Sequence, residues 1–349
     1  ADRINDASCN ILLTSDGSYR GSKQLCLKAI ADKALESCSS ITSCIVLKRT
    51  GENISMKPKR DFWWKEETSK VSSLCKAQQM DSEDPLFILY TSGSTGKPKG
   101  VQHHCGGYMV YAEYSFRNVF QYNQNDIYWC TADIGWITGH TYIVYGPLLA
   151  GATTLMFEGV PTFPDAGRFW EICDKHQVNI FYTAPTAIRA LQACGNEFPE
   201  KYDLSSLKTL GSVGEPINEE AWHWYNKYIG KEKCSIVDTW WQTETGGILI
   251  SPLSNITKTK PTYATLPLPG IQPCIVDLNG EELLGNNVQG NLCIKFPWPS
   301  MIRTIYGDHE RCKNVYFSNY PGKYFTGDGC KRDEDGFYRI TGRVDDVIN

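Results

Sequence analysis

The chain has 349 residues with 41% hydrophobic content, enough apolar material for two or more packed units. A formal net charge of −4 and a pI near 5.9 give no electrostatic footprint for nucleic acid or for an anionic membrane, so we expect neither as a partner. The apolar runs are short and interrupted, which argues against a transmembrane segment, and the first ten residues lack the pattern of a secretory signal.

Alternating β-rich and amphipathic stretches predict an α/β fold. In chain order, strands are expected at residues 86–90, 127–131, 153–157, 180–183, 209–213 and 236–240. Helices are expected at residues 106–120, 165–176, 185–193 and 218–229, the last with Asn218 as its N-cap. Strands and helices alternating at this spacing predict a mostly parallel sheet covered by helices.

Beyond Pro252 the sequence pattern changes to short expected strands separated by Gly, Asn and Pro turns, which predicts a smaller β-rich subdomain. We therefore expect a partial N-terminal α/β portion at 1–80, an α/β core at 81–254 and the β-rich subdomain at 255–342. The last residues, 343–349, stop in the middle of a pattern, and the chain begins without a methionine. We interpret it as a piece of a longer protein.

Fourteen cysteines are scattered singly between Cys9 and Cys330, with no CxxC pair and no Cys/His cluster at metal-ligand spacing. In a large chain without a signal they are best explained as small buried side chains in a reducing compartment. We expect the cytoplasm, and a nuclear or organellar pool is also compatible with the sequence.

A loop rich in glycine, hydroxyl and lysine residues, YTSGSTGKPKG (90–100), follows the first strand expected in the core. Glycines allow close backbone approach, and amide, hydroxyl and lysine donors suit phosphate groups. The loop is not a Walker loop, because Thr91 stands where that motif needs its first glycine and Pro98 where it needs a hydroxyl. A flexible polar linker is the alternative, but two lysines and a proline directly after a buried strand favour phosphate binding.

This loop resembles the signature loop of the adenylate-forming superfamily, which includes acyl-CoA synthetases, adenylation domains and luciferase-like proteins. Other motifs occur in the superfamily's order: GSVGEPIN (211–218), DTWWQTETGG (238–247), YFTGDG (324–329) and TGRVDDVIN (341–349). Together with DIGWITGHTYIVYGPL (133–148) and YTAPTAIRAL (182–191), they are similar to the acetyl-CoA synthetase family. The resemblance implies the layered, helix-covered sheets of the large adenylate-forming domain plus a β-rich subdomain. It covers essentially the whole chain, which corresponds to the middle part of such an enzyme and lacks the C-terminal domain with its catalytic lysine.

The resemblance implies an AMP-forming acetate–CoA ligase. Such an enzyme activates acetate with ATP to acetyl-adenylate, releases pyrophosphate, and transfers the acetyl group to coenzyme A with release of AMP. The implied ligands are ATP, acetate, coenzyme A and Mg²⁺, while the oligomeric state is left open. A propionate or other short-chain acyl-CoA synthetase is the nearer alternative, and a non-catalytic nucleotide-binding module is the alternative of another class. The presence of Lys97, Glu244, Asp328 and Arg343 favours an enzyme, although we expect little or no full activity from this chain alone.

The resemblance also assigns site residues. Catalysis is assigned to Thr91 and Lys97, the magnesium carboxylate to Glu244 and the hinge to Asp345. ATP or AMP binding is assigned to Thr91, Ser92, Gly93, Ser94, Thr95, Gly96, Lys97, Gly214, Glu215, Pro216, Asp238, Thr239, Trp240, Trp241, Gln242, Thr243, Asp328 and Arg343. The acetate pocket is assigned to Ile137, Thr138, Val213 and Trp241, and coenzyme A binding to Arg20, Lys23, Thr138 and Thr162.

Three of these assignments have a physical basis in the residues themselves. Trp240 and Trp241 are adjacent on an extended segment and must point to opposite sides, so one can be core while the other walls a pocket. In the family a small residue at the Trp241 position accompanies longer acids, so tryptophan favours a two-carbon acid, with about 1–3 kcal/mol of discrimination per methylene. Asp328 lies between two glycines, where we expect a tight turn with an exposed carboxylate that accepts ribose hydroxyls; an ordinary Asp-Gly turn is the alternative.

The remaining polar candidates are treated more plainly. Lys23 stands where the family has arginine, and lysine supplies a charge without a bidentate fork. Thr162 replaces an asparagine common in the acetyl-CoA synthetases. His103, His104 and His140 are expected to be structural, because the implied mechanism needs no acid–base histidine.

Overall fold

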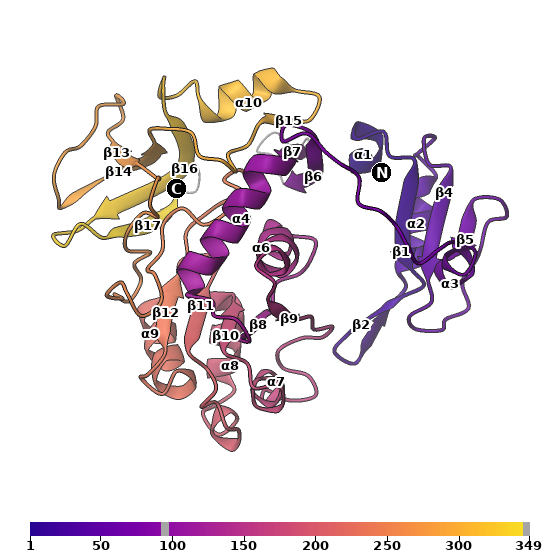
Figure 1. Ribbon diagram of the computed structural model, residues 1–349, viewed down its shortest axis with the longest axis horizontal. Helices are drawn as coiled ribbons and strands as arrows, with labels where there is room; N and C mark the ends of the chain where they lie inside the picture. The colour runs from indigo at the N-terminus through magenta and orange to yellow at the C-terminus, as the bar shows by residue number, and fades with distance from the viewer. Residues whose placement is uncertain (92–97, 345–349) are drawn as a thin grey trace. The chain divides into compact units, whose positions relative to one another are not determined.

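The computed structural model describes residues 1–91 and 98–344 (Figure 1). Contacts divide the chain into two units. The first combines Ala1–Met80, Tyr90–Gly100 and Glu158–Pro164, and the second combines Asp81–Leu89, Val101–Phe157 and Asp165–Asn349. Each unit is described on its own.

The first unit contains a three-stranded parallel sheet in the order β1-β4-β5, formed by β1 (Ile11–Ser15), β4 (Ser43–Leu47) and β5 (Asp61–Trp63). Its helices are α1 (Asp2–Asp6), α2 (Leu27–Leu35) and α3 (Trp64–Thr68). A two-residue turn joins β2 (Ser18–Arg20) to β3 (Lys23–Leu25) in an antiparallel hairpin. The small core consists of the buried side chains Leu35, Cys38, Cys44 and Val46.

A buried carboxylate closes the turn after β1. Asp16 is 0% exposed, and its two oxygens accept hydrogen bonds from the backbone N–H groups of Gly17, Arg49, Thr50 and Gly51 at 2.7 to 3.0 Å. Burial alone raises the pKa of Asp16, but the backbone donors outweigh it and lower the pKa to about 2. The charge is therefore stabilised by main-chain dipoles.

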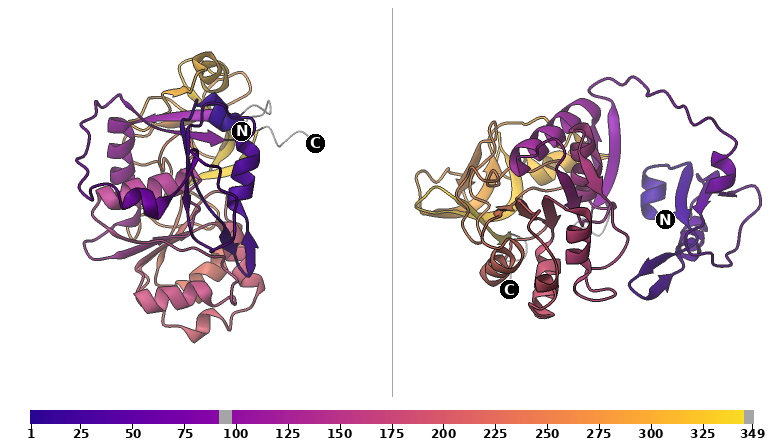
Figure 2. Two further views of the ribbon diagram at one scale, coloured as in Figure 1. Left: turned by 90° about the vertical axis from the view of Figure 1, so that its right-hand side faces the viewer. Right: turned by 60° about the horizontal axis from the view of Figure 1, so that its bottom comes forward.

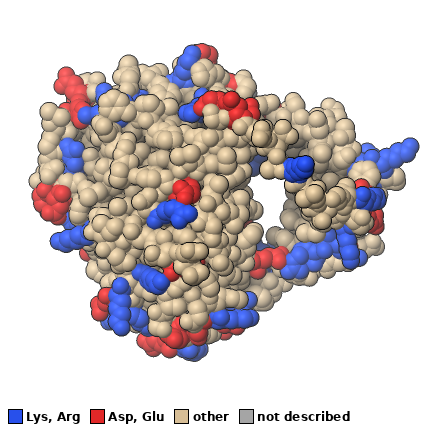
Figure 3. Space-filling model, in the orientation of Figure 1, with Lys and Arg blue, Asp and Glu red and all other residues tan. Residues whose placement is uncertain are grey.

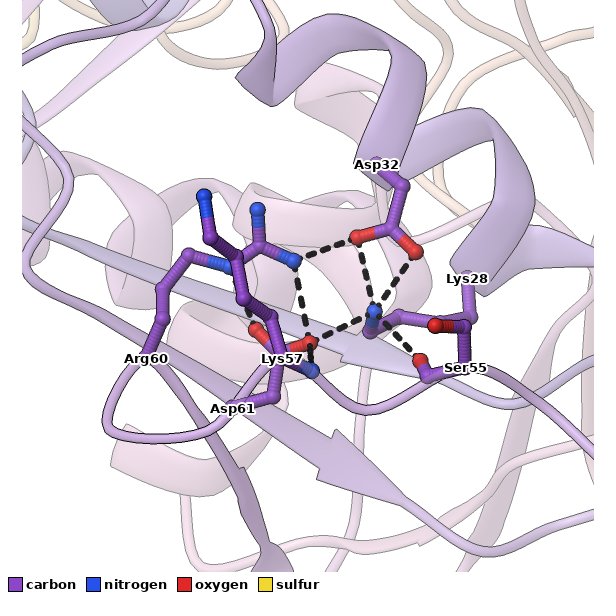
Figure 4. A network of polar contacts seen from close by, with 6 residues as sticks. All are labelled: Lys28, Asp32, Ser55, Lys57, Arg60 and Asp61. Atoms are coloured by element: carbon purple, nitrogen blue, oxygen red, sulfur yellow. Dashed lines mark hydrogen bonds and ion pairs between the residues drawn. The ribbon is translucent and has the colours of Figure 1, made fainter.

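A second polar cluster ties α2 to β5 and to the segment between β4 and β5 (Figure 4). Lys28 is 1% exposed, and its ammonium lies 2.7 Å from Asp32 Oδ1, 2.8 Å from Asp61 Oδ2 and 3.0 Å from the Ser55 carbonyl. Arg60 donates to both carboxylates. Two cations thus balance two anions in a largely buried site, which is the condition under which buried charges are tolerated.

The second unit is built on a five-stranded parallel sheet with the order β12-β11-β10-β8-β9. The strands are β8 (Ile127–Cys130), β9 (Thr153–Leu155), β10 (Ile180–Thr183), β11 (Thr209–Ser212) and β12 (Ser235–Asp238). Helices α7 (Arg168–His176), α8 (Pro185–Ala193) and α9 (Glu219–Trp224) lie on one side of it, and α4 (Cys105–Phe120) lies on the other (Figure 1). The predicted helix-covered parallel sheet is confirmed.

Side chains that alternate along each strand divide the interior into two cores. Tyr128 and Tyr182 enter one core together with α4, while the neighbouring Trp129 and Phe181 enter the other with α7 and α9. Both faces of the sheet are therefore buried, as is usual for parallel strands.

Two helical segments contain π-helical turns. One continuous segment consists of α5 (Ile137–Gly139), the π-helical turn η1 (His140–Tyr145) and α6 (Gly146–Leu149). The other continues α9 into the π-helical turn η3 (Tyr225–Ile229), so the helix predicted for 218–229 changes type within its length. Asn218 occupies the N-cap position as predicted, but its side chain makes no capping hydrogen bond. A short 3₁₀ turn, η2, covers Pro199–Lys201.

A four-stranded antiparallel sheet in the order β13-β14-β16-β17 makes up the β-rich part of the second unit (Figure 2). Its strands are β13 (Pro273–Val276), β14 (Val288–Ile294), β16 (Tyr324–Arg332) and β17 (Tyr338–Arg343). A third sheet has the order β15-β7-β6, from β6 (Pro85–Thr91), β7 (Lys99–His104) and β15 (Thr304–Ile305), and α10 (His309–Tyr316) follows β15.

On the face of the second unit shown in Figure 3, basic and acidic side chains are interspersed. Among the helices of the described ranges, none combines the length and the apolar content needed to cross a bilayer.

Candidate nucleotide and acyl site

The carboxyl ends of β11 and β12 bring the first group of candidate residues together, at the edge where ligands of open parallel sheets bind. Thr239, directly after β12, donates its hydroxyl to the Ser212 carbonyl at 2.7 Å and accepts from the Tyr182 hydroxyl at 2.7 Å. Asp238, the last residue of β12, is 6% exposed, and burial raises its pKa to about 7. Thr239 is thus fixed by hydrogen bonds at the sheet edge, and Asp238 is buried beside it.

The turn after β11 presents open backbone. Gly214, Glu215 and Pro216 are all exposed, and Gly214 has a φ of +99°, a conformation that favours glycine. A methyl group at Gly214 would meet no atom within 4 Å among the described residues. Glu215 is held by an ion pair of 2.7 Å with Arg189. The turn therefore offers a flat, unobstructed surface beside the sheet edge.

Asp328 was expected at a tight turn with an exposed carboxylate, and that expectation is wrong. The residue lies inside strand β16 opposite Arg343 and is 6% exposed. The flanking glycines serve the strand instead: Gly327 has a φ of +73°, and a β-bulge follows Gly329. Burial raises the pKa of Asp328, and the nearby Arg343 guanidinium opposes this rise.

Both oxygens of Asp328 are engaged by side chains from other parts of the site. Oδ2 accepts from Trp240 Nε1 at 3.0 Å and from Gln242 Nε2 at 2.8 Å, while Oδ1 lies 3.3 Å from Arg343 Nη1. The side-chain Oε1 of Gln242 in turn accepts from the Tyr324 hydroxyl at 3.0 Å. Three of roughly four lone-pair sites on the carboxylate are in use, the longest contact being that to Arg343.

The two tryptophans have different neighbours. Trp240 is 7% exposed, belongs to the hydrophobic cluster that also contains Val213, and donates its indole N–H to Asp328. The half-buried Trp241 packs against that cluster and against the cluster that contains Ile137. Thr138, the fourth predicted pocket residue, is 9% exposed and lies next to Ile137 in α5.

The segment after Trp241 is held by two residues to which the sequence assigned no ligand role. The buried His103 lies 2.8 Å from the Thr243 carbonyl through Nε2, which must carry the proton because a carbonyl only accepts. Burial lowers the pKa of His103 to about 4, so the ring is neutral at pH 7, in agreement with a structural role. The Tyr316 hydroxyl donates to Glu244 Oε1. Since these contacts join residues 140 and 72 positions apart, no local pattern could have indicated them.

Seven predicted site residues lie outside the described residues: Ser92, Gly93, Ser94, Thr95, Gly96, Lys97 and the hinge residue Asp345. Thr91 ends β6, and its buried hydroxyl has no hydrogen-bond partner in the described part of the chain.

Arg20, Lys23 and Thr162 belong to the first unit, and Thr138 belongs to the second. Arg20 and Lys23 are exposed and face each other across the β2–β3 hairpin. The hairpin turn at Gly21 lies beside Val160 and Phe163, which flank Thr162. These three predicted coenzyme A residues are therefore near neighbours on one surface.

Comparisons with known proteins identify the family of the chain. The family model described as "AMP-binding enzyme" matches residues 1–306. The chain is similar to acetyl-coenzyme A synthetases from Parvibaculum lavamentivorans (59% identical over 349 residues), Alkalilimnicola ehrlichii (60% over 348) and Rhizobium meliloti (58% over 353). Each alignment covers 100% of this chain and 54% of the relative, so the chain spans about half the length of the curated relatives it matches. The chain belongs to the family of AMP-binding enzymes.

Proposed function

We propose that this chain is the nucleotide- and acyl-binding part of an AMP-forming acetyl-CoA synthetase. The observation that carries the proposal is the pair of different environments around the adjacent Trp240 and Trp241. Trp240 donates to Asp328, and Trp241 packs against the two hydrophobic clusters that include Ile137 and Val213. A single short segment therefore has a polar side suited to a nucleotide and an apolar side suited to a small acyl group, as a reaction between the two requires.

The nucleotide would occupy the sheet edge. Adenine lies against the exposed turn Gly214–Pro216, near Asp238 and Thr239. The ribose hydroxyls are accepted by Asp328, where they replace the long contact with Arg343. Arg343, opposite Asp328 on β17, is assigned to the ribose or the phosphate. Gln242 and Trp240 hold the carboxylate in place, while Thr243 and the loop 91–97 with Lys97 bind the phosphates.

The acyl pocket favours acetate. Its walls are Ile137, Thr138, Val213 and Trp241, and the large indole occupies the volume that a longer chain would need. Since one methylene is worth about 1–3 kcal/mol in such a pocket, propionate is the closest competitor and butyrate is excluded more strongly.

Magnesium fits the residues that are present. Glu244 offers one buried carboxylate whose orientation is fixed by Tyr316. One protein carboxylate completed by substrate phosphates and water is a usual donor set for Mg²⁺. When bound, the ion would offset the negative charge of the phosphates. This chain's own part is to hold the Glu244 carboxylate toward the phosphate end of the site.

The reaction then follows in two balanced steps. The acetate carboxylate attacks the α-phosphorus of ATP, and the bond to pyrophosphate breaks, giving acetyl-adenylate. The thiol of coenzyme A attacks the acetyl carbonyl, loses its proton and displaces AMP, giving acetyl-CoA. Arg20, Lys23 and Thr162 are assigned to the nucleotide end of coenzyme A, Thr138 to its pantetheine arm, and Asp345 to a hinge toward a further domain. We assign the protein to the cytoplasm.

The test is carboxylate-dependent ATP–pyrophosphate exchange, measured on a polypeptide of the relatives' full length that contains this sequence. Acetate, propionate and butyrate are compared side by side. We expect the strongest exchange with acetate and none with butyrate. A maximum with propionate would support the propionate enzyme instead, and no exchange with any acid despite ATP binding would leave only the nucleotide-binding module.

A further inference from the structure

Trp241 can exclude longer acids only if its ring cannot turn away from the pocket. The residue packed directly against that ring is Tyr142, at ring centroids 4.9 Å apart and an interplanar angle of 89°. We propose that Tyr142 is a positioning residue for substrate specificity, which holds Trp241 in the orientation that closes the acyl pocket. This inference rests on the proposed function and identifies a residue behind the pocket wall.

The contact has the edge-to-face geometry that aromatic rings prefer over a stacked sandwich. Tyr142 is 0% exposed and sits in the same hydrophobic cluster as Val213, so its ring fills the space next to the indole. It also meets Tyr182 edge-on, with centroids 5.9 Å apart. Movement of Trp241 toward Tyr142 would therefore require a closely packed core to open.

Hydrogen bonds fix Tyr142 itself, and their directions can be assigned. Its oxygen accepts from the Ile248 N–H at 2.7 Å. The Ser115 hydroxyl donates to the Tyr111 carbonyl at 2.7 Å, so Ser115 must accept from the Tyr142 hydroxyl at 2.8 Å. The Tyr111 hydroxyl then donates to the Ile248 carbonyl at 2.8 Å. These hydrogen bonds connect Tyr142 through Ser115 and Tyr111 back to Ile248, so the Tyr142 ring has little freedom to move.

Tyr142, the brace that supports Trp241, and the pocket residues Ile137 and Thr138 belong to one helical segment. Ile137 and Thr138 lie in α5, and Tyr142 lies in the π-helical turn η1 that continues it. Thr141 fastens the same turn to the backbone of the Trp241 segment, because its hydroxyl donates to the Gly246 carbonyl at 3.0 Å. π-Helical turns occur frequently at functional sites. Here the turn allows one short segment to supply both a pocket wall and the support for the opposite wall.

Side chains pack closely around Tyr142. A methyl group at Gly247 would lie 2.8 Å from the Tyr111 ring and 3.3 Å from the Tyr142 oxygen. Removing the Tyr142 ring should therefore create a void beside Trp241, into which the indole can rotate. Since a hydrophobic pocket discriminates about 10- to 200-fold per methylene, we expect partial loss of the brace to reduce the preference for acetate over propionate roughly 5- to 10-fold.

The experiment compares five variants of the full-length protein in ATP–pyrophosphate exchange with acetate, propionate and butyrate. Tyr142→Leu removes the brace, and Tyr142→Phe keeps the ring but removes its hydroxyl anchors. Tyr128→Leu is the matched control, because Tyr128 is also 0% exposed and in the same cluster but packs on Phe116 and Phe120. Trp241→Gly, alone and with Tyr142→Leu, completes a double-mutant cycle.

We expect Tyr142→Leu to lower the ratio of acetate to propionate kcat/KM, Tyr128→Leu to leave it unchanged, and Tyr142→Leu to have no further effect once Trp241 is glycine. Equal losses with acetate and propionate, or the same change of ratio in the Trp241→Gly background, would overturn the inference. If Tyr142→Leu does not fold, Tyr142→Phe decides, with a two- to threefold fall in the ratio expected and an unchanged ratio against it. Failure of the proposed function gives a different result, because the unmodified protein then shows no acid-dependent exchange.

Discussion

Replacing Asp16 by asparagine tests the idea that a buried charge can be held by backbone amides. The substitution keeps the shape of the side chain and changes only one oxygen to an NH₂ group. In the structure, Oδ1 receives three N–H donors and Oδ2 receives the Gly51 N–H at 2.8 Å. If the asparagine amide oxygen occupies the Oδ1 position, the amide NH₂ group faces the Gly51 N–H. Two hydrogen-bond donors then oppose each other.

The magnitude follows from these contacts. An unsatisfied buried donor costs about 1–3 kcal/mol, and hydrogen bonds to a charged acceptor are stronger than those to a neutral one by about 1 kcal/mol each. The variant is relieved of burying a charge, which offsets part of this loss. We expect Asp16→Asn to lower the free energy of unfolding of the first unit by about 2–4 kcal/mol.

The pH dependence gives an independent check. The pKa of Asp16 is lowered from 3.8 to about 2 in the folded chain. Its contribution is therefore complete above the unfolded-state pKa near 4 and is lost as the pH falls toward 2. The stability difference between the two proteins should be constant above pH 4 and shrink below it.

The assay is urea unfolding with hydrogen exchange of the peptides covering residues 11–51, repeated between pH 7 and pH 2. Asp277→Asn is the control, because Asp277 accepts similar turn bonds from Asn279 and Glu281 in a partly exposed hairpin. If Asp16→Asn destabilises no more than this control, or keeps the acid dependence of the unmodified protein, the reasoning is wrong.

Three further predictions concern the polar clusters of the two units. Lys28→Met should destabilise the first unit by about 3 kcal/mol, because it leaves Asp61 buried with only part of its countercharge. Combining Lys28→Met with Asp61→Leu should recover much of the lost stability, as measured by thermal unfolding. Glu244→Gln should remove the Mg²⁺-dependent part of ATP affinity and leave AMP affinity within about twofold, since AMP lacks the phosphates that share the ion. Calorimetric titration with and without Mg²⁺ measures both affinities, and an equal loss for both nucleotides would contradict the prediction. Asp328→Asn should weaken AMP binding about tenfold or more through the loss of a charged acceptor, whereas an unchanged dissociation constant would remove Asp328 from the ribose site.

The parts of the fold that depend on local pattern could be predicted from the sequence. The helix predicted for residues 185–193 coincides with α8, and the strand predicted for 180–183 coincides with β10. Alternation along such strands, as at Trp129 and Phe181, also determines which side chains enter which core. The same rule leads one to expect different neighbours for the adjacent Trp240 and Trp241, and Trp240 contacts Asp328 while Trp241 packs on Tyr142.

The failures have different physical causes. The glycines around Asp328 suggest a turn, yet a β-bulge uses the same backbone freedom to keep a strand continuous, and only pairing with β17 decides between the two. The π-helical turn at His140–Tyr145 depends on packing, because its residues have ordinary helical spacing. Partners such as Tyr316 for Glu244 depend on chain segments that approach each other only in the folded protein.

The hydrogen bonds around Asp328 also affect how a divergent relative should be judged. Asp328 joins β16 to the Trp240–Gln242 segment whether or not a nucleotide is bound, so a descendant that had lost catalysis would still need it for folding. Its presence alone therefore says little about activity. The open surface around Gly214 is more informative than the glycine itself. The φ of +99° favours glycine with or without a ligand, but a methyl group there would meet no described atom, so packing does not require the surface to stay open. A relative that covers this turn with a large side chain would have kept the architecture and given up the ligand.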